Sequence, residues 1–296
     1  MKINAAVIAL LSCALMVDGE PTPISLLEAD CGVSISGSSS QNSKIVNGWP
    51  ADMFGNPWMA LISSSVTCGG SLITNRFVLS AAHCRTNSHT VVYLGEFDRS
   101  TTTDCSNAGC MPNAIGIPVD AQIAHPSYIH LSQNDIALFR LATPVQYTAY
   151  IQPICLLTNY NPLNSIRHLT ATGWGKTEFG LPSSILRTAT LTQVDRSYCS
   201  GIYGNRVDMS HICAGDYNSH TCMGDSGGPI SAVITINGRI RVAQFGIVSY
   251  GDSECRELGV YTNVMHHMNW IASVVRHGGP QVTQRPNYYY IQWYYI

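Results

Sequence analysis

Short apolar segments separated by turn residues make up most of the chain after Ile45. The segments RFVLSAAH, TVVYLGEF and DIALFRL are rich in β-branched and aromatic residues, which favour strands. The segments ISAVITI and RIRVAQFGIVSYG flank Asn237–Gly238. This dipeptide predicts a tight hairpin because both central residues of such a turn need positive φ. The pattern therefore predicts a domain built mainly from short strands.

One segment near the C-terminus has a helical period. Val264, Met268, Ile271 and Val275 recur at steps of three and four over residues 263–276, which predicts an amphipathic helix. Many strands followed by one late helix indicate an all-β barrel or sandwich.

The N-terminus has the pattern of a secretory signal. Lys2 is followed by the apolar run Ala5–Val17 and a polar exit, so we expect cleavage near Gly19 and a signal peptide over residues 1–19. The alternative is a membrane-anchoring helix, which needs about 20 apolar residues, more than this run offers. The sequence therefore predicts a secreted, extracellular protein without a membrane span.

Two other segments differ from the strand-rich region. Residues 20–44 include the Gly/Ser-rich stretch GSSSQNSK, which is typical of a flexible segment. Residues 278–296 form a tail that ends in NYYYIQWYYI. We interpret it as a loosely docked tail, although its aromatics would also suit an adhesive strand or a membrane-interface contact.

Composition narrows the class of partner. The formal net charge is −2 and only 11% of the residues are charged, so the basic face of a nucleic-acid-binding protein is not expected. Loss of the signal would remove Cys13 and leave ten of the eleven cysteines, an even number that favours disulfides. Zinc is the alternative, but no CxxC pair is present.

Three residues have the chemistry of a nucleophilic site. An alcohol such as that of Ser226, in GDSGGP, needs a base, a group that orients the base, and donors for the developing oxyanion. His83, in LSAAHC, is the candidate base, and Asp135, in NDIAL, is the candidate orienter. A core histidine and a turn-forming acid are the ordinary interpretations of each alone. All three in this order match one known pattern.

Residues 45–277 resemble the peptidase domain of the chymotrypsin/trypsin family of serine endopeptidases, through KIVNG, LSAAHC, NDIAL, TGWG, GDSGGP, GIVSYG and GVYTNV in order. The resemblance implies two six-stranded antiparallel β-barrels with a C-terminal helix. It implies that His83 is the general base, Asp135 its orienter and Ser226 the nucleophile that forms an acyl-enzyme. The amides of Gly224 and Ser226 would form the oxyanion hole.

The resemblance also implies an activation step. An activating protease would cut after Lys44, at the end of a propeptide over residues 20–44, and free the amino group of Ile45. That group would pair with Asp225, a carboxylate that is costly to bury alone, and order the oxyanion hole. The secreted chain is therefore expected to be a zymogen.

The same resemblance implies partners for all the remaining cysteines except Cys105 and Cys110. These two are close enough in the sequence to bond each other. A further disulfide of many relatives is absent here, because Leu169 and Ala232 occupy its two positions. The expected pairs are Cys31–Cys155, Cys68–Cys84, Cys199–Cys213, Cys222–Cys255 and Cys105–Cys110.

By the same resemblance Cys31–Cys155 would tether the propeptide after activation. This tether and the small Cys105–Cys110 loop resemble features of arthropod haemolymph proteases, which often carry an N-terminal clip domain with six cysteines. Only Cys31 lies between the signal and Lys44, so we expect this chain to lack that domain. Glu96, Asp98 and Asp104 offer oxygen ligands that calcium prefers. We favour solvated loop acids there, and therefore no metal or cofactor.

Alignment through Cys222 puts His220 at the pocket floor, where trypsins carry an aspartate. A desolvated imidazole tends to stay neutral, so an inserted arginine would lack its counter-charge and strictly tryptic cleavage is not expected. Asp216 and Asp252 lie in loops near this pocket in the sequence and could approach it from the side, but we favour solvated loop acids. An open pocket for large apolar, aromatic or hydrogen-bonding side chains is the favoured interpretation. The pocket residues by resemblance are His220, Thr221, Met223, Ser249, Tyr250, Gly251 and Gly259.

A non-catalytic homologue that uses the same barrels as a binding or cofactor module is the main alternative. Such homologues usually lose a triad member, whereas His83, Asp135 and Ser226 are all present. An adhesive protein is a third possibility, but it would explain only the aromatic tail. The expected partners are protein or peptide substrates, an activating protease and a protein inhibitor. The protein is expected to be a monomer.

Overall fold

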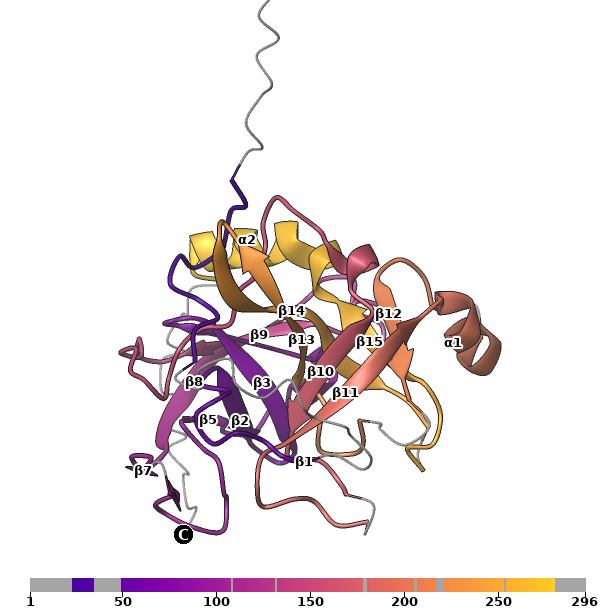
Figure 1. Ribbon diagram of the computed structural model, residues 1–296. Coiled ribbons are helices and arrows are strands. Elements are labelled where there is room, and N and C mark those ends of the chain that lie inside the picture. The colour runs from indigo at the N-terminus through magenta and orange to yellow at the C-terminus, as the bar shows by residue number, and fades with distance from the viewer. Residues whose placement is uncertain are drawn as a thin grey trace, which may run out of the picture.

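Two β-barrels lie side by side, with helices at the periphery (Figure 1). The predicted signal, Lys44, Ile45, His220 and nearly all of the C-terminal tail lie outside the described residues. The computed structural model describes residues 23–34, 49–107, 109–130, 132–177, 180–204, 207–216, 221–252 and 254–279.

The first barrel is closed and antiparallel, in the order β2-β3-β4-β9-β8-β5. Its interior holds fully buried aliphatic and aromatic side chains such as Leu72, Leu79 and Phe139. Its strands are β2 (Met59–Ser63), β3 (Thr67–Thr74), β4 (Phe77–Ser80), β5 (Val91–Leu94), β8 (Ile115–Ala124) and β9 (Ala137–Leu141).

The second barrel has the order β11-β10-β13-β14-β15-β12, and β11 also pairs with β12, which closes it. The short strand β1 (Trp49–Pro50) adds to the edge of β11. The predicted class of two six-stranded antiparallel barrels is therefore confirmed. The strands are β10 (His168–Gly173), β11 (Arg187–Val194), β12 (His211–Gly215), β13 (Pro229–Ile236), β14 (Arg239–Tyr250) and β15 (Gly259–Asn263).

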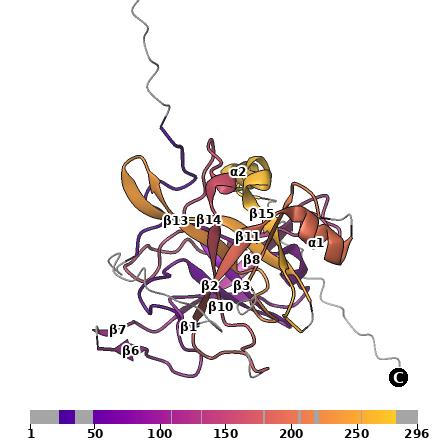
Figure 2. The same cartoon turned by 45° about the vertical axis from the view of Figure 1, so that its right-hand side comes forward.

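The predicted hairpin joins β13 to β14. Asn237 and Gly238 have φ angles of 49° and 77°, and Ile236 pairs with Arg239 across the turn. Both central residues therefore have the positive φ that the turn requires. A second, two-stranded hairpin, β6 (Cys105–Ser106) and β7 (Gly109–Cys110), projects from the first-barrel side of the molecule in both views (Figures 1 and 2).

The predicted C-terminal helix is present as α2 (Met268–His277). It follows a 3₁₀ turn, η3 (Val264–His267), and the Asn263 side chain accepts a hydrogen bond from the amide of Met265. Short 3₁₀ segments are frequent at helix starts, so the periodic pattern extends beyond the α-helix itself. Two further 3₁₀ turns are η1 (Ala82–Cys84) and η2 (Leu163–Ser165).

A second helix, α1 (Arg196–Tyr203), was not predicted. Asp195 caps it by accepting a hydrogen bond from the amide of Ser197 at 2.8 Å. Cys199 is its one buried residue among those described, so no apolar period marks it in the sequence. No helix within the described ranges is long and apolar enough to cross a membrane.

The segment 23–34 is packed along the second barrel. Gly32 donates from its amide to the Pro153 carbonyl at 2.7 Å and accepts at its own carbonyl from the Val242 amide at 3.0 Å. The side chain of Asn237, at the hairpin tip, bonds both the amide and the carbonyl of Ile24. Residues 23–34, which belong to the region expected to be a propeptide, are therefore packed as a part of the fold.

The structure contains the five expected disulfides. Leu169 continues the β10–β13 register opposite Ala232, since Thr170 pairs with Ser231, and both side chains belong to one apolar cluster. Apolar packing thus replaces the disulfide that many relatives have there. The five bonds are Cys31–Cys155, Cys68–Cys84, Cys105–Cys110, Cys199–Cys213 and Cys222–Cys255.

Candidate active site

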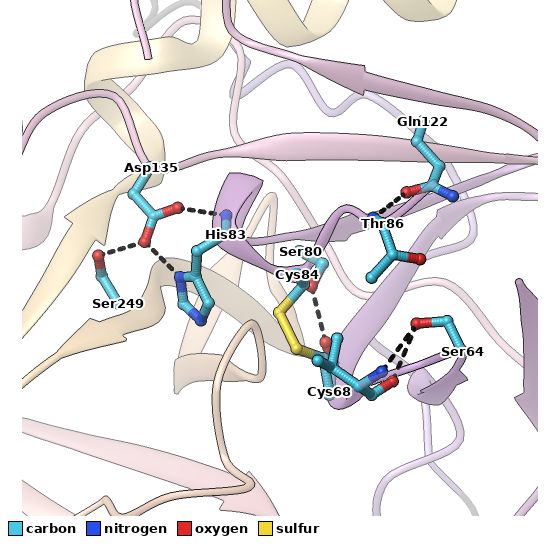
Figure 3. Close-up of a disulfide and its surroundings, with 11 residues drawn as sticks. Ser64, Cys68, Ser80, His83, Cys84, Thr86, Gln122, Asp135 and Ser249 are labelled. Carbon is cyan, nitrogen blue, oxygen red and sulfur yellow. Dashed lines mark hydrogen bonds and ion pairs between the residues drawn. A yellow bond between two sulfur atoms is a disulfide. The ribbon is translucent and has the colours of Figure 1, made fainter. Parts of the chain in front are cut away.

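His83 and Asp135 form a close pair at the junction of the two barrels (Figure 3). His83 lies in the 3₁₀ turn η1, directly after β4, and the Cys68–Cys84 disulfide fixes this turn to β3. The Nδ1 atom of His83 lies 2.7 Å from Oδ2 of Asp135, and the His83 amide donates to Oδ1 at 3.0 Å. Both oxygens of one carboxylate therefore orient one imidazole.

Asp135 is almost fully buried, with 2% exposure, and two residues of the second barrel support it. The Ser249 hydroxyl donates to Oδ2 at 2.6 Å, and the Thr262 hydroxyl donates to the Asp135 carbonyl at 2.8 Å. Burial would raise the pKa of this carboxyl, but the hydrogen bonds and charge of His83 and the Ser249 hydroxyl outweigh burial and hold the pKa below its usual range. The carboxyl is therefore ionised at neutral pH.

Ser226 lies in a turn that is pressed against the segment bearing His83. Its carbonyl accepts from the amide of Gly69, the residue after Cys68. A Cβ added at Gly227 would lie 2.0 Å from the Ser80 hydroxyl, so only glycine permits this approach. Within the described residues the Ser226 hydroxyl makes no hydrogen bond to His83. Direct contact between the base and the nucleophile therefore stays a prediction. Catalytic hydrogen bonds are often long before substrate binds.

The amides of Gly224 and Ser226 have no acceptor among the described residues. Both residues are only partly buried and lie two positions apart in one turn, so their amides are available to donate to an oxygen on which negative charge develops. Gly224 has a φ of 101°, and a Cβ there would lie 3.0 Å from the Cα of Gly175. The donors are thus held in a backbone conformation that other residues rarely adopt.

The carboxyl of Asp225 is enclosed by two glycines of the TGWG motif. It accepts from the amides of Gly175 and Cys222 at 2.8 and 2.9 Å. A Cβ on Gly173 would lie 2.3 Å from Oδ1, so the glycines provide the space. Burial raises the pKa of this carboxyl to about 6. The described part of the chain offers it no cation, and Ile45, the expected partner, lies outside that part.

The pocket residues that are described lie around the Cys222–Cys255 disulfide. The Thr221 hydroxyl lies 2.9 Å from the hydroxyl of Tyr261, a residue that the sequence analysis missed. Gly259 and Tyr261 are two apart on β15 and so share a face, and a Cβ on Gly259 would lie 2.8 Å from the Tyr261 hydroxyl. This alternation in GVYTNV is the signal that would have identified Tyr261.

The other pocket residues fit an open entrance. A Cβ on Gly251 would meet nothing closer than 3.8 Å, and Met223 is 58% exposed. Asp252 accepts from the amides of Glu254 and Arg256, so it caps its own loop, and Asp216 is exposed. His220 lies outside the described residues, so its place at the pocket floor stays a prediction.

The three loop acids are engaged by local donors. Asp98 accepts from the amide and hydroxyl of Ser100, and Asp104 accepts from the Thr101 hydroxyl. Glu96 accepts from the next amide along the chain. Calcium binding here stays untested. Where the chain is described, the one cluster with metal-ligand geometry is Cys68, His83 and Cys84, whose two sulfurs already bond each other.

Comparison with known proteins identifies the family of this chain. A family model described as Trypsin matches residues 45–271. The chain is similar to Melanization protease 1 of Drosophila melanogaster, with 39% identity over 250 residues, covering 74% of this chain and 62% of that protein. It is also similar to Phenoloxidase-activating factor 3 of Holotrichia diomphalia, with 38% identity over 259 residues, 79% of this chain and 73% of that protein.

A solved structure gives the same result at the level of the fold. The crystal structure of the Drosophila Grass clip serine protease of the Toll pathway matches with a TM-score of 0.74 and 33% identity. The match covers 84% of this chain and 75% of that one. This chain spans 62% of the length of the melanization protease, which is less than two thirds.

Proposed function

This chain belongs to the trypsin family, and on that premise we propose that it is a secreted serine endopeptidase made as a zymogen. The observation that carries the proposal is the hydrogen-bonded His83–Asp135 pair, together with Ser226, whose own amide and that of Gly224 have no acceptor among the described residues. A binding module has no need for a buried, ionised carboxylate that orients an imidazole. The non-catalytic alternative gives no reason for this arrangement.

The proposed reaction follows from these positions. The Ser226 hydroxyl attacks the scissile carbonyl while Nε2 of His83 takes its proton, and Asp135 holds Nδ1–H and stabilises the imidazolium. The amides of Gly224 and Ser226 bind the oxygen on which negative charge develops. His83 then protonates the leaving amine, and water hydrolyses the acyl-enzyme through the same base.

The test of catalysis is reaction with a fluorophosphonate, which labels an activated serine. After cleavage at Lys44 the chain should be labelled stoichiometrically and should hydrolyse peptides. The Ser226→Ala variant should show neither result, because the nucleophile is gone. Ser88→Ala, which removes an exposed hydroxyl of the first barrel, is the matched control. A cleaved, folded wild-type chain that stays unlabelled would establish the non-catalytic module instead.

We further propose that the side-chain preference is not strictly tryptic. The support is the sequence position of His220 together with an open Gly251 and an exposed Met223. Profiling the activated enzyme with a peptide library should show cleavage after large apolar, aromatic or hydrogen-bonding residues. His220→Asp should move cleavage toward Arg and Lys, since it adds the missing counter-charge. Dominant cleavage after Arg and Lys by the wild-type enzyme would contradict this preference.

The substrates are proposed to be proteins, and the other partners an activating protease and a protein inhibitor. Two of the similar proteins have names that refer to melanization and phenoloxidase activation. Those names support limited cleavage of a protein precursor as the type of reaction. The free amides and the Ser249–Gly251 segment, at the end of β14, would receive an extended peptide.

A further inference from the structure

The loop that leads into Asp135 belongs to the first barrel but is held by the second. His211, on β12, is 2% exposed, and its Nε2 atom lies 2.9 Å from the carbonyl oxygen of Ser132. Ser132 precedes Asp135 by three residues. A buried imidazole of one barrel therefore contacts the backbone of the other barrel's acid-bearing loop.

The contacts of Nδ1, the other nitrogen of the His211 ring, determine which nitrogen carries the proton. The amide of Asp208 points at Nδ1 from 3.2 Å, and an amide can only donate, so Nδ1 is an acceptor in the neutral ring. The proton then lies on Nε2, which donates to the Ser132 carbonyl. The carboxylate of Asp208 also lies 3.1 Å from Nδ1, so a protonated ring would keep the Nε2 donor as well. The donated bond thus persists in both charge states.

Thr262 supplies a second donor beside the first. His211 and Thr262 face each other in the β12–β15 register, and the Thr262 hydroxyl donates to the Asp135 carbonyl at 2.8 Å. The two donors therefore bond carbonyls on either side of Asn134, whose φ of 54° is uncommon for a side-chain-bearing residue. A backbone in that conformation persists only where the surroundings hold it.

Two further contacts connect the same residues to the triad. The side-chain Nε2 of Gln133 donates to Oδ2 of Asp208 at 3.1 Å, and Oδ1 of Asp208 lies 3.1 Å from Nδ1 of His211, so Asp208 contacts both the loop and the imidazole. The ring of His211 also packs edge-on against Tyr250, at 6.3 Å between centroids. Tyr250 follows Ser249, which donates to the Asp135 carboxylate. His211 thus contacts both the loop and the strand that support Asp135.

We propose that His211 is a positioning residue for catalysis: its Nε2–H bond to the Ser132 carbonyl fixes the loop that presents Asp135 to His83. This inference rests on the proposed function. It assigns no contact with substrate to His211. It predicts instead that loss of the donor slows the chemical step and leaves substrate binding largely intact. The reason is that Asp135 would hold the His83 imidazole in its catalytic orientation for a smaller fraction of the time.

The test compares His211→Leu with His211→Gln in the activated enzyme. Leucine removes the donor, whereas the amide nitrogen of glutamine takes the place of Nε2 and keeps it. With leucine, kcat per active site, counted by fluorophosphonate titration, should fall about tenfold with KM little changed. Glutamine should restore most of kcat. A merely structural role would lower the number of active sites and leave kcat per site unchanged.

His168→Leu, which makes the same change at an exposed position on β10, should leave kcat and KM unaffected. If His211→Leu is not secreted, Thr262→Val and Thr262→Ser give the same comparison at the Asp135 carbonyl, with valine slow and serine near wild type. Wild-type kcat per site in His211→Leu, or glutamine as slow as leucine, would overturn the role of His211. An unlabelled wild-type chain would instead overturn the proposed function.

Discussion

Asp135→Asn should lower kcat/KM by about 10⁴-fold, the loss typical of this change in a Ser-His-Asp triad. The structure gives the physical reason. Oδ1 faces the backbone amide of His83, an obligate donor, so the asparagine must place its carbonyl oxygen there. Its NH₂ group then occupies the position of Oδ2, next to Nδ1 of His83 and the Ser249 hydroxyl.

An NH₂ group at that position makes Nδ1 an acceptor and moves the imidazole proton to Nε2. A protonated Nε2 cannot take the proton of Ser226, so the base is lost while the geometry is kept. The Ser249 hydroxyl can rotate to accept, so the fold should tolerate the change.

Steady-state kinetics at pH 7, with sites counted by slow fluorophosphonate labelling, measures this effect. Asp30→Asn, at an exposed position, serves as the matched control. The melting temperature should change little. Activity within tenfold of wild type would show that Asp135 does not orient the base.

Lys44→Gln should leave the secreted chain uncut by its activating protease and without peptidase activity. The Lys44–Ile45 bond lies outside the described residues, and the support for this prediction comes from Asp225. This buried carboxyl has no cation among the described residues, and its pKa is raised to about 6. A freed Ile45 amino group is the partner that would remove the cost of burying the charge.

The raised pKa gives the uncut chain a defined pH dependence. The folded state binds the Asp225 proton more tightly than the unfolded state, whose reference pKa is 3.8. The free energy of unfolding therefore falls as pH rises from about 4 to about 6, by about 3 kcal/mol for a shift of about two units. Below the reference pKa this contribution is fully present.

Denaturant unfolding of Lys44→Gln at pH 4 and pH 7, compared with Lys44→Gln/Asp225→Asn, isolates this contribution. The double variant should lack the fall in stability, because its side chain does not titrate. In the cut wild-type chain the fall should also disappear, since the ammonium favours the ionised carboxyl. Equal pH profiles for the two Lys44→Gln chains would contradict the assignment, and so would full activity from an intact Lys44–Ile45 bond.

The sequence predicted those features that local chemistry determines. The Asn237–Gly238 turn and the α2 period follow from short local patterns. The pairing of His83 with Asp135, 52 positions away, was implied only by the family resemblance. The helix α1 was missed because a surface helix with one buried residue has no apolar period.

Other features depend on contacts between distant segments, which no local pattern encodes. His211 has the sequence context of an ordinary strand residue, and only the packing of β12 against the segment before Asp135 places an acceptor, the Ser132 carbonyl, at its Nε2 atom. The Tyr261 hydroxyl contacts the hydroxyl of Thr221, which lies forty positions away in the sequence. The segment 23–34 was expected to be part of a propeptide, yet backbone bonds to residues 153 and 242 incorporate it into the fold beside the second barrel.

That segment changes what activation produces. Because Cys31 is joined to Cys155 and Ile24 is bonded to the hairpin tip, a cut after Lys44 would release nothing into solution. The product would be a two-chain molecule in which the upstream fragment stays covalently attached to the peptidase domain.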